Sequence, residues 1–238
     1  HFRCQSCGYA RPTPLVSCAV LNEEEDGSQV EFSVPGGAYQ AKIGLPGLYN
    51  VYNALSAAAL GLALDLPAAL VSEALLTFEH GFGRMESFCA DGRTIKIILV
   101  KNPTGFNLAL KHLETLAGPV FPAFMINDKL ADGTDISWLW DVDFENFSES
   151  ISAANAGSED SAFIAVSGIR AYDMALRLKY SGTPESLIFL NPDPVAAFDK
   201  LLSLAPKGAV ICLMPTYTVL LELRDVLAKR YKLKEFWE

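Results

Sequence analysis

Two cysteines near the start of the chain have the spacing of a metal-binding knuckle. Cys4 and Cys7 are separated by two residues, and Gly8 follows directly. Two thiolates at this spacing approach one metal ion from a tight turn, as in one half of a zinc ribbon. A structural Zn2+ needs four ligands, and no second pair of this kind follows in the sequence. The pattern fits half of a four-cysteine site, and it also fits two free thiols in a frayed terminus.

Two asparagines further along the chain are candidates for ligand recognition. Asn50 and Asn53 are three residues apart in a segment rich in Ala and Leu, which places both side chains on one face of a helix. An amide group carries both a donor and an acceptor, which suits a purine edge or a phosphate. Such a pair also fits a simple helix cap.

A segment rich in aspartate and tryptophan is the third candidate. Asp135 ends the run Ala-Asp-Gly-Thr-Asp, and Trp138 and Trp140 follow it. Taken by itself, Asp135 fits a solvated turn residue or a cap for the following stretch. The two tryptophans fit either aromatic anchors of a partner interface or members of the core.

Composition excludes several classes of protein. The formal net charge of −9 argues against a sequence-independent nucleic-acid-binding protein, which needs a basic surface. No apolar run reaches the roughly 18 residues of a membrane-spanning helix. The five cysteines are an odd number, and three of them are scattered singly, which indicates a reducing compartment. We therefore expect a cytoplasmic protein with no nucleic-acid partner and no transmembrane segment.

The elements that would position these residues fall into two groups, of which the first is small. Short alternating runs at 15–21, 30–34 and 38–43 predict an antiparallel meander. The residues 50–66 lack Pro and are rich in Ala and Leu, which predicts a helix. A second helix is expected from 67 to about 78.

The second group alternates apolar runs with helical stretches. The apolar runs lie at 95–100, 120–126, 163–166, 187–190 and 209–214. Helices are expected at 105–116, 171–180, 194–204 and 218–231. This alternation predicts an α/β domain with a mostly parallel sheet that is buried on both faces. The small, polar and acidic residues 148–161 indicate a surface loop. We place the domain boundary between 1–83 and 84–238.

Three motifs, in this order and spacing, resemble those of Mur ligases and folylpolyglutamate synthases. The run Gly-x-x-Asn-x-x-Asn-Ala-x-x-Ala-Ala from Gly47 resembles the signature that closes their central domain, with Tyr49 where these enzymes usually have His. Gly-Arg-Met-Glu from Gly83 resembles their hinge into the C-terminal domain, and Lys-Asn-Pro-Thr-Gly from Lys101 resembles a turn that they share. The resemblance implies the remnant of a central domain followed by a Rossmann-like Mur ligase C-terminal domain.

Other segments resemble one branch of this superfamily, the MurT family. They are the acidic, Trp-containing segment 127–145, the run Gly-x-Arg-Ala-x-Asp-x-Ala-x-Arg from Gly168, and Pro-Thr-Tyr-Thr from Pro215. Many MurT chains insert a four-cysteine ribbon in the central domain, which Cys4 and Cys7 would fit. The resemblance covers essentially the whole chain, and 127–145 is its most specific part.

The resemblance implies an ATP-dependent ligase subunit of peptidoglycan and cell wall synthesis. MurT subunits work with GatD, a glutamine amidotransferase that frees ammonia from glutamine, and they amidate the α-carboxylate of D-glutamate in lipid II. ATP and Mg2+ would activate this carboxylate as an acyl phosphate, which ammonia converts to D-isoglutamine. Because the substrate is a lipid, the protein would act at the inner face of the membrane.

The resemblance also assigns roles to single residues. Asn50 and Asn53 would lie near the adenine, and Arg84 would contact the nucleotide through its guanidinium fork. The remaining cofactor-binding positions are Lys101 and Asn102, in a turn that would face the cleft.

For Asp135 the resemblance implies a catalytic role across a subunit interface. By this resemblance, Asp135 would complete the Cys–His pair of GatD. An Asp that orients the basic His is the usual third member of such a triad.

One feature departs from the superfamily: the Gly-x-x-Gly-Lys-Thr nucleotide loop is absent from the sequence. We therefore expect a C-terminal fragment that is inactive alone as a synthetase but still binds GatD. One alternative is a non-catalytic interaction module that docks a glutamine amidotransferase. Another is a folylpolyglutamate synthase or ordinary Mur ligase that adds an amino acid, against which the cysteine knuckle and the acidic Trp segment argue.

Overall fold

The structure is a computed structural model, and it describes residues 2–24, 27–45, 47–78, 84–155 and 163–233. The chain forms two compact units, His1–Glu79 and His80–Glu238. The domain boundary expected after residue 83 lies at the edge of 79–83, which are outside the described residues.

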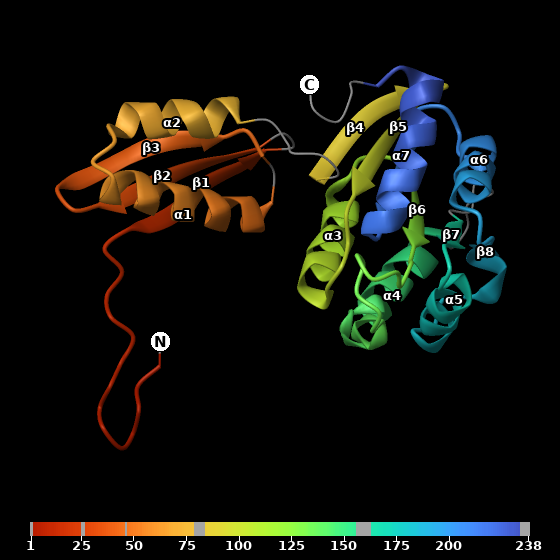
Figure 1. Cartoon of the computed structure of the whole chain (residues 1–238), viewed down its shortest axis with the longest axis horizontal. Helices are drawn as coiled ribbons and strands as arrows, with labels where there is room; N and C mark the ends of the chain where they lie inside the picture. The colour runs from red at the N-terminus through yellow and green to blue at the C-terminus, as the bar shows by residue number, and fades with distance from the viewer. Residues whose placement is uncertain (1, 25–26, 46, 79–83, 156–162, 234–238) are drawn as a thin grey trace. The chain divides into compact units, whose positions relative to one another are not determined.

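The first unit combines a three-stranded antiparallel sheet with two helices (Figure 1). Its strands are β1 (Ser17–Glu24), β2 (Gly27–Val34) and β3 (Gly37–Ile43), and its helices are α1 (Leu48–Ala63) and α2 (Ala68–Thr77). Apolar residues of β2, β3 and both helices form a small core, which consists of Val30, Phe32, Ile43, Val51, Ala54, Ala58 and Val71. The predicted meander and the two predicted helices are confirmed.

The second unit is built on a six-stranded sheet in the order β4-β5-β9-β6-β7-β8. The strands are β4 (Arg84–Ala90), β5 (Arg93–Ile98), β6 (Val120–Met125), β7 (Ile164–Ser167), β8 (Ile188–Leu190) and β9 (Val210–Pro215). The helices are α3 (Pro103–Thr115), α4 (Phe144–Asn155), α5 (Ala171–Tyr180), α6 (Pro194–Leu204) and α7 (Tyr217–Tyr231), with short 3-10 helices η1 (Ser137–Asp141) and η2 (Glu185–Leu187). Only β4 runs antiparallel to its neighbour in this sheet. The predicted α/β fold with a mostly parallel sheet is confirmed.

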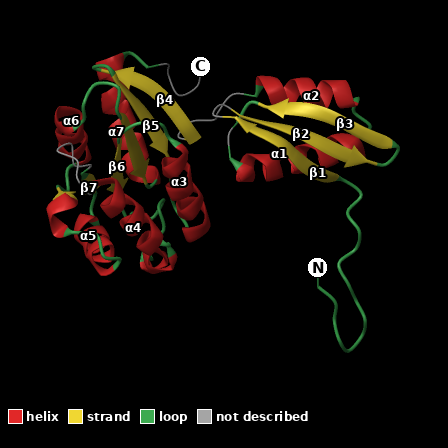
Figure 2. Ribbon diagram, turned by 180° about the vertical axis from the view of Figure 1, so that it is seen from behind, coloured by secondary structure: helices red, strands yellow, loops and turns green. Residues whose placement is uncertain are grey.

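Helices cover both faces of this sheet (Figures 1 and 2). Alternate residues of the parallel strands face opposite layers of these helices. In β9, Cys212 and Met214 pack with residues of α3, α4 and α5. The alternate residues of β9, Ile211 and Leu213, pack with residues of α6 and α7. Burial on both faces explains why these strands are continuous apolar runs in the sequence.

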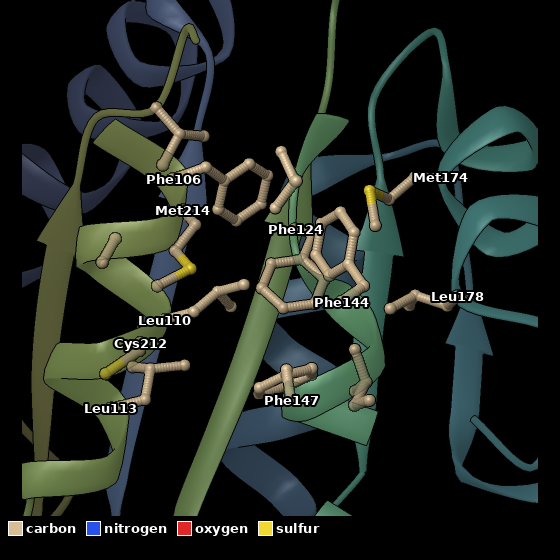
Figure 3. Close-up of a cluster of buried hydrophobic side chains, with 14 of the residues drawn as sticks. Phe106, Leu110, Leu113, Phe124, Phe144, Phe147, Met174, Leu178, Cys212 and Met214 are labelled. Carbon is tan, nitrogen blue, oxygen red and sulfur yellow. The ribbon is translucent and has the colours of Figure 1, made fainter. Parts of the chain in front are cut away.

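Four phenylalanines form the centre of the first of these layers (Figure 3). The ring of Phe124 on β6 lies 5.3 Å from that of Phe106 and 5.5 Å from that of Phe147, centroid to centroid. Phe144 packs edge-on against Phe106 at 5.1 Å. Edge-to-face contacts of this kind add to the free energy gained by burying the rings.

Residues 148–155 do not form the surface loop that we expected. They belong to α4, while 156–162 lie outside the described residues. Ser148 is buried, and its hydroxyl lies 2.6 Å from those of Ser181 and Thr183. The polar character of Ser148 was misleading because its hydroxyl bonds to other hydroxyls inside the protein. Strand β4 was also not predicted.

The turn after β7 depends on a glycine. Gly168 has φ 89°, and a Cβ atom there would lie 2.4 Å from the carbonyl oxygen of Ile126. The same oxygen accepts the N–H of Arg170 at 2.9 Å. Only glycine combines this backbone conformation with so close an approach.

The connections of the sheet place its loops at one edge. Strands β6 and β9 are neighbours, but the helices that follow them, α4 and α7, cover opposite faces. In open α/β sheets, ligands bind outside the carboxyl ends of the strands at such a switch point. The loops at 126–136 and 215–218 therefore form the candidate site.

We predict that Phe124→Ala lowers the free energy of unfolding by about 3–5 kcal/mol, because it removes a ring from the centre of a packed layer. Urea unfolding followed by circular dichroism measures this. The control is Tyr172→Ala, whose side chain is 70% exposed and for which we expect a change within about 0.5 kcal/mol. Equal effects of the two substitutions would contradict the packing described here.

Candidate functional site

Asn127 joins three loops at the carboxyl edge of the sheet. It is 4% exposed and lies two residues after the end of β6. Its backbone N–H donates to Thr216 Oγ1 at 2.9 Å, and its Nδ2 donates to Thr218 Oγ1 at 2.9 Å. Its Oδ1 accepts the N–H of Ile169 at 2.9 Å. The ends of β6, β7 and β9 are thus tied through one side chain and its own backbone.

Asp132 fastens the loop after β6 to the start of α7. Its carboxylate accepts the backbone N–H of Thr218 at 2.7 Å and the hydroxyl of Thr218 at 2.6 Å. It also accepts the N–H of Lys129 at 3.2 Å. The N-cap residue of α7, Thr216, makes no side-chain cap bond of its own. Asp132 therefore caps this helix from another loop, where a negative charge is favoured by the helix dipole.

Asp128, between these two residues in the sequence, forms an ion pair with Arg170. Nε of Arg170 donates to Oδ2 of Asp128 at 2.8 Å, and Nη2 lies 2.5 Å from the same oxygen. This carboxylate raises the pKa of the Arg170 guanidinium, with a smaller contribution from Asp173. The pair links the loop after β6 to the start of α5.

Asp135 lies on the exposed part of the same loop. Its Oδ1 accepts the N–H of Ser137, the first residue of η1, at 2.8 Å. This backbone hydrogen bond, together with one from the Ser137 hydroxyl, lowers the pKa of the Asp135 carboxyl group. The side chain is therefore ionised at neutral pH and is open to solvent.

The two tryptophans after Asp135 have different environments. Trp138 is half-buried and packs on the core, with its ring centroid 6.2 Å from that of Phe106. Trp140 is 53% exposed, and its ring lies edge-on to Tyr180 at 5.7 Å. Of the two alternatives left open by the sequence, the core suits Trp138, while Trp140 offers an exposed aromatic surface.

The turn after β5 contains Lys101 and Asn102, two of the expected cofactor-binding residues. Asn102 is the N-cap of α3, and its Oδ1 accepts the N–H of Gly105 at 2.8 Å. The side chains of both residues are exposed. Asn102 thus has a structural role in starting the helix, and its amide N–H group is the part that a ligand would use.

The other expected nucleotide contacts lie elsewhere in the chain. Asn50 and Asn53 share a face of α1 as predicted, with Asn53 Nδ2 at 3.5 Å from Asn50 Oδ1. Asn50 is 6% exposed, whereas Asn53 is exposed. Arg84 begins β4, but its side chain is outside the described residues. The structure therefore brings Asn50 and Asn53 together on α1. Lys101 and Asn102 lie together in the turn before α3.

The cysteine pair forms a tight knuckle. The backbone N–H of Cys4 donates to Tyr9 O at 2.7 Å, and that of Gly8 donates to Cys4 O at 3.0 Å. Both Cys4 and Cys7 are exposed. Backbone N–H groups of Cys7 and Ser6 lower the pKa of the Cys4 thiol. These features suit a thiolate ligand and so fit two of the four ligands of a zinc site. Among the described residues, no three His, Cys, Asp or Glu side chains cluster to complete one.

Sequence reasoning did not assign roles to Asn127, Asp132 or Thr218. All three were within recognised segments, but their partners lie far away in the chain: Asn127 and Thr218 are 91 residues apart. The available signal was the run of polar residues directly after the buried strand 120–126, which marks the carboxyl edge of a parallel sheet.

Comparison with known proteins identifies the family. Residues 99–220, more than half of the 238 residues, match the family described as MurT ligase C-terminal. The chain belongs to this family. The resemblance inferred from the motifs is thereby confirmed.

Two curated relatives extend the likeness over nearly the whole chain. The MurT subunit of the lipid II isoglutaminyl synthase (glutamine-hydrolyzing) of Streptococcus pneumoniae is 32% identical over 228 residues, which are 95% of this chain and 48% of that protein. The subunit of the same name in Staphylococcus aureus is 30% identical over 232 residues, which are 98% of this chain and 49% of that protein. The chain thus spans about half the length of these relatives.

Solved structures share the fold. MurF from Acinetobacter baumannii superimposes with a TM-score of 0.67 at 16% identity, over 90% of this chain and 45% of that one. A pseudomurein peptide ligase type C from Methanothermus fervidus also gives 0.67, at 22% identity, over 94% of this chain and 44% of that one. The predicted Mur ligase architecture is confirmed. In the described part of the chain, no helix is both long and apolar enough to cross a bilayer.

We predict that Asn127→Ala lowers the free energy of unfolding by about 1–3 kcal/mol, because buried hydrogen-bonding groups lose their partner. Urea unfolding measures the loss. Asn146→Ala, at an exposed position on α4, is the matched control and should change it by no more than about 0.5 kcal/mol. If Asn127→Ala leaves the free energy of unfolding unchanged, the three loops hold together without this side chain.

The cysteines are expected to differ in reactivity, because the thiolate is the species that reacts. The lowered pKa of Cys4 increases its thiolate fraction at neutral pH, whereas burial raises the pKa of Cys212 to about 12. Iodoacetamide labelling followed by mass spectrometry should modify Cys4 rapidly and Cys212 only after unfolding. Raising the pH should accelerate labelling of Cys4 until its pKa is passed.

The reference in this experiment is Cys89, an exposed thiol on β4. Labelling of Cys4 that is slower than that of Cys89 would contradict the effect assigned to the knuckle.

Proposed function

We propose that this chain is the C-terminal half of a MurT-type ligase subunit that amidates the D-glutamate α-carboxylate of lipid II, with ammonia from a GatD-type glutaminase. Family membership supports the ligase class. The observation that carries the finer proposal is the exposed, ionised carboxylate of Asp135 in a loop that is fastened at its base. In this proposal Asp135 is the catalytic residue that the subunit supplies to its partner.

The geometry of Asp135 suits the third member of a triad. One carboxylate oxygen accepts the N–H of Ser137, which restricts the orientation of the group. The exposed carboxylate can accept an imidazole N–H from a neighbouring polypeptide. There it would orient the basic His and stabilise the imidazolium that forms as the nucleophilic Cys loses its proton.

The synthetase step would use ATP and Mg2+. Transfer of the γ-phosphoryl group to a carboxylate oxygen gives an acyl phosphate and ADP; ammonia then attacks the carbonyl carbon, and phosphate leaves. In this chain Asn50, Asn53, Arg84, Lys101 and Asn102 are the proposed nucleotide contacts. Since the Gly-Lys-Thr loop is not in the sequence, these residues alone should not support the reaction.

Two further assignments follow from the proposal. Cys4 and Cys7 would supply two thiolates to a structural Zn2+, the other two ligands coming from residues of the longer protein. A lipid-linked substrate would hold the enzyme at the cytoplasmic face of the membrane. Residues 1–83 would be the end of the central domain, and 84–238 the C-terminal domain.

We predict that Asp135→Ala in the full-length subunit, bound to its glutaminase, lowers kcat for glutamine hydrolysis roughly 1,000- to 10,000-fold, as expected when the Asp of a triad is lost. Glutamate release measures the rate. The control is Asp225→Ala, another exposed carboxylate, which should leave kcat unchanged. If the Asp135→Ala complex forms and hydrolyses glutamine at full rate, the subunit docks the glutaminase without supplying a catalytic group, and the triad proposal is wrong.

A further inference from the structure

Arg177 on α5 is a buried cation. The residue is 3% exposed, and its guanidinium carbon lies 5.4 Å from the ring centroid of Trp140 and 5.3 Å from that of Phe144. A buried charge is costly unless its donors are all well used. The contacts of Arg177 therefore deserve a structural or functional explanation.

The hydrogen bonds of Arg177 converge on one short stretch of chain. Nε donates to Leu139 O at 3.1 Å, and Nη2 donates to Val142 O at 2.7 Å. Nη1 and Nη2 also donate to the two carboxylate oxygens of Glu145, both at 2.9 Å. Thus one side chain of α5 holds η1, the turn after it and the first residues of α4 in a single arrangement.

This stretch is the one that fixes Asp135. Its first residue, Ser137, donates the N–H that orients the Asp135 carboxylate. On the other side, Asp132 is bonded to Thr218 at the start of α7. Asp135 therefore lies between two anchored points, and Arg177 provides the one that follows it in the sequence.

We propose that Arg177 is a positioning residue for the glutaminase reaction, which holds η1 and the start of α4 so that the Asp135 carboxylate reaches the partner's imidazole. This inference rests on the function proposed above for Asp135. Arg177 itself touches no reacting atom. It acts through Leu139, Val142 and Glu145 on the backbone that carries Ser137.

Lysine cannot replace Arg177 in this role. Its ammonium group is a compact point charge, whereas the contacts of Arg177 need a planar fork with donors directed at two carbonyl groups and a carboxylate. Arg177→Lys keeps the charge but loses part of this set. The substitution therefore perturbs the position of η1 with the smallest change in charge and volume.

The test is a double-mutant cycle in the full-length subunit bound to its glutaminase, with kcat and KM for glutamine measured in each variant. Arg177→Lys should lower kcat about 10- to 100-fold, because a displacement on the order of 1 Å is enough for such a loss. KM should not change, since glutamine binds to the partner. In the Asp135→Ala background, the same substitution should have no further effect on kcat, because its action passes through Asp135.

The control is Arg224→Lys. Arg224 is another largely buried arginine, but it pairs with Glu86 on β4, at the edge of the sheet opposite β8. It should alter thermal stability without changing kcat. A second variant, Glu145→Gln, keeps Arg177 and its carbonyl contacts, and should lower kcat less than Arg177→Lys, again only when Asp135 is present. This variant replaces Arg177→Lys if the latter does not fold.

The outcomes separate the two proposals. Suppose that Asp135→Ala lowers kcat and that the folded Arg177 or Glu145 variants lower kcat by the same factor with and without Asp135. Arg177 then has no positioning role, and the triad stands. An unchanged kcat in the folded Arg177 and Glu145 variants would likewise show that Arg177 has no positioning role. If Asp135→Ala itself leaves kcat unchanged, the triad fails and the role of Arg177 fails with it.

Discussion

Burial of the parallel sheet on both faces is the constraint on which the rest of this structure depends. Strands such as β6 and β9 contribute side chains to both helical layers, so they have no place for exposed polar groups. Polar residues are therefore concentrated where the strands end. Because α4 and α7 leave for opposite faces, the loops before them meet at one edge, where Asn127 and Asp132 join them.

The loop after β6 contains three aspartates that have different roles because their surroundings differ. Asp128 is used in an ion pair, and Asp132 caps a helix from a distance. Asp135 accepts hydrogen bonds locally from Ser137 and faces solvent. Asp128 and Asp132 hold the loop in place. Asp135 is therefore held in an ordered loop while its carboxylate stays available to another molecule. A group presented to another polypeptide needs this combination of order and exposure.

The sequence was sufficient for most of the fold, because burial on both faces leaves continuous apolar runs such as 95–100 and 120–126. It failed at Ser148, where hydroxyl groups bond to one another inside the protein. Contacts between distant residues, as between Asn127 and Thr218, have no local signature and needed the fold. For Asp135, the residues alone favoured a turn or a cap, and the structure does show a local turn bond. Its proposed catalytic role came from the family resemblance.

The turn at Gly168 has a consequence for how this protein can vary. The carbonyl of Ile126 and the backbone of Gly168 approach so closely that any side chain would force the end of β7 away from β6. The next residue, Ile169, donates its N–H to Asn127, so the displacement would reach the loop network directly. Substitution there would thus be transmitted through Asn127 to Thr216 and Thr218 in the loop at 215–218. We therefore expect position 168 to accept glycine alone, because any larger residue would have to separate two neighbouring strands of the sheet.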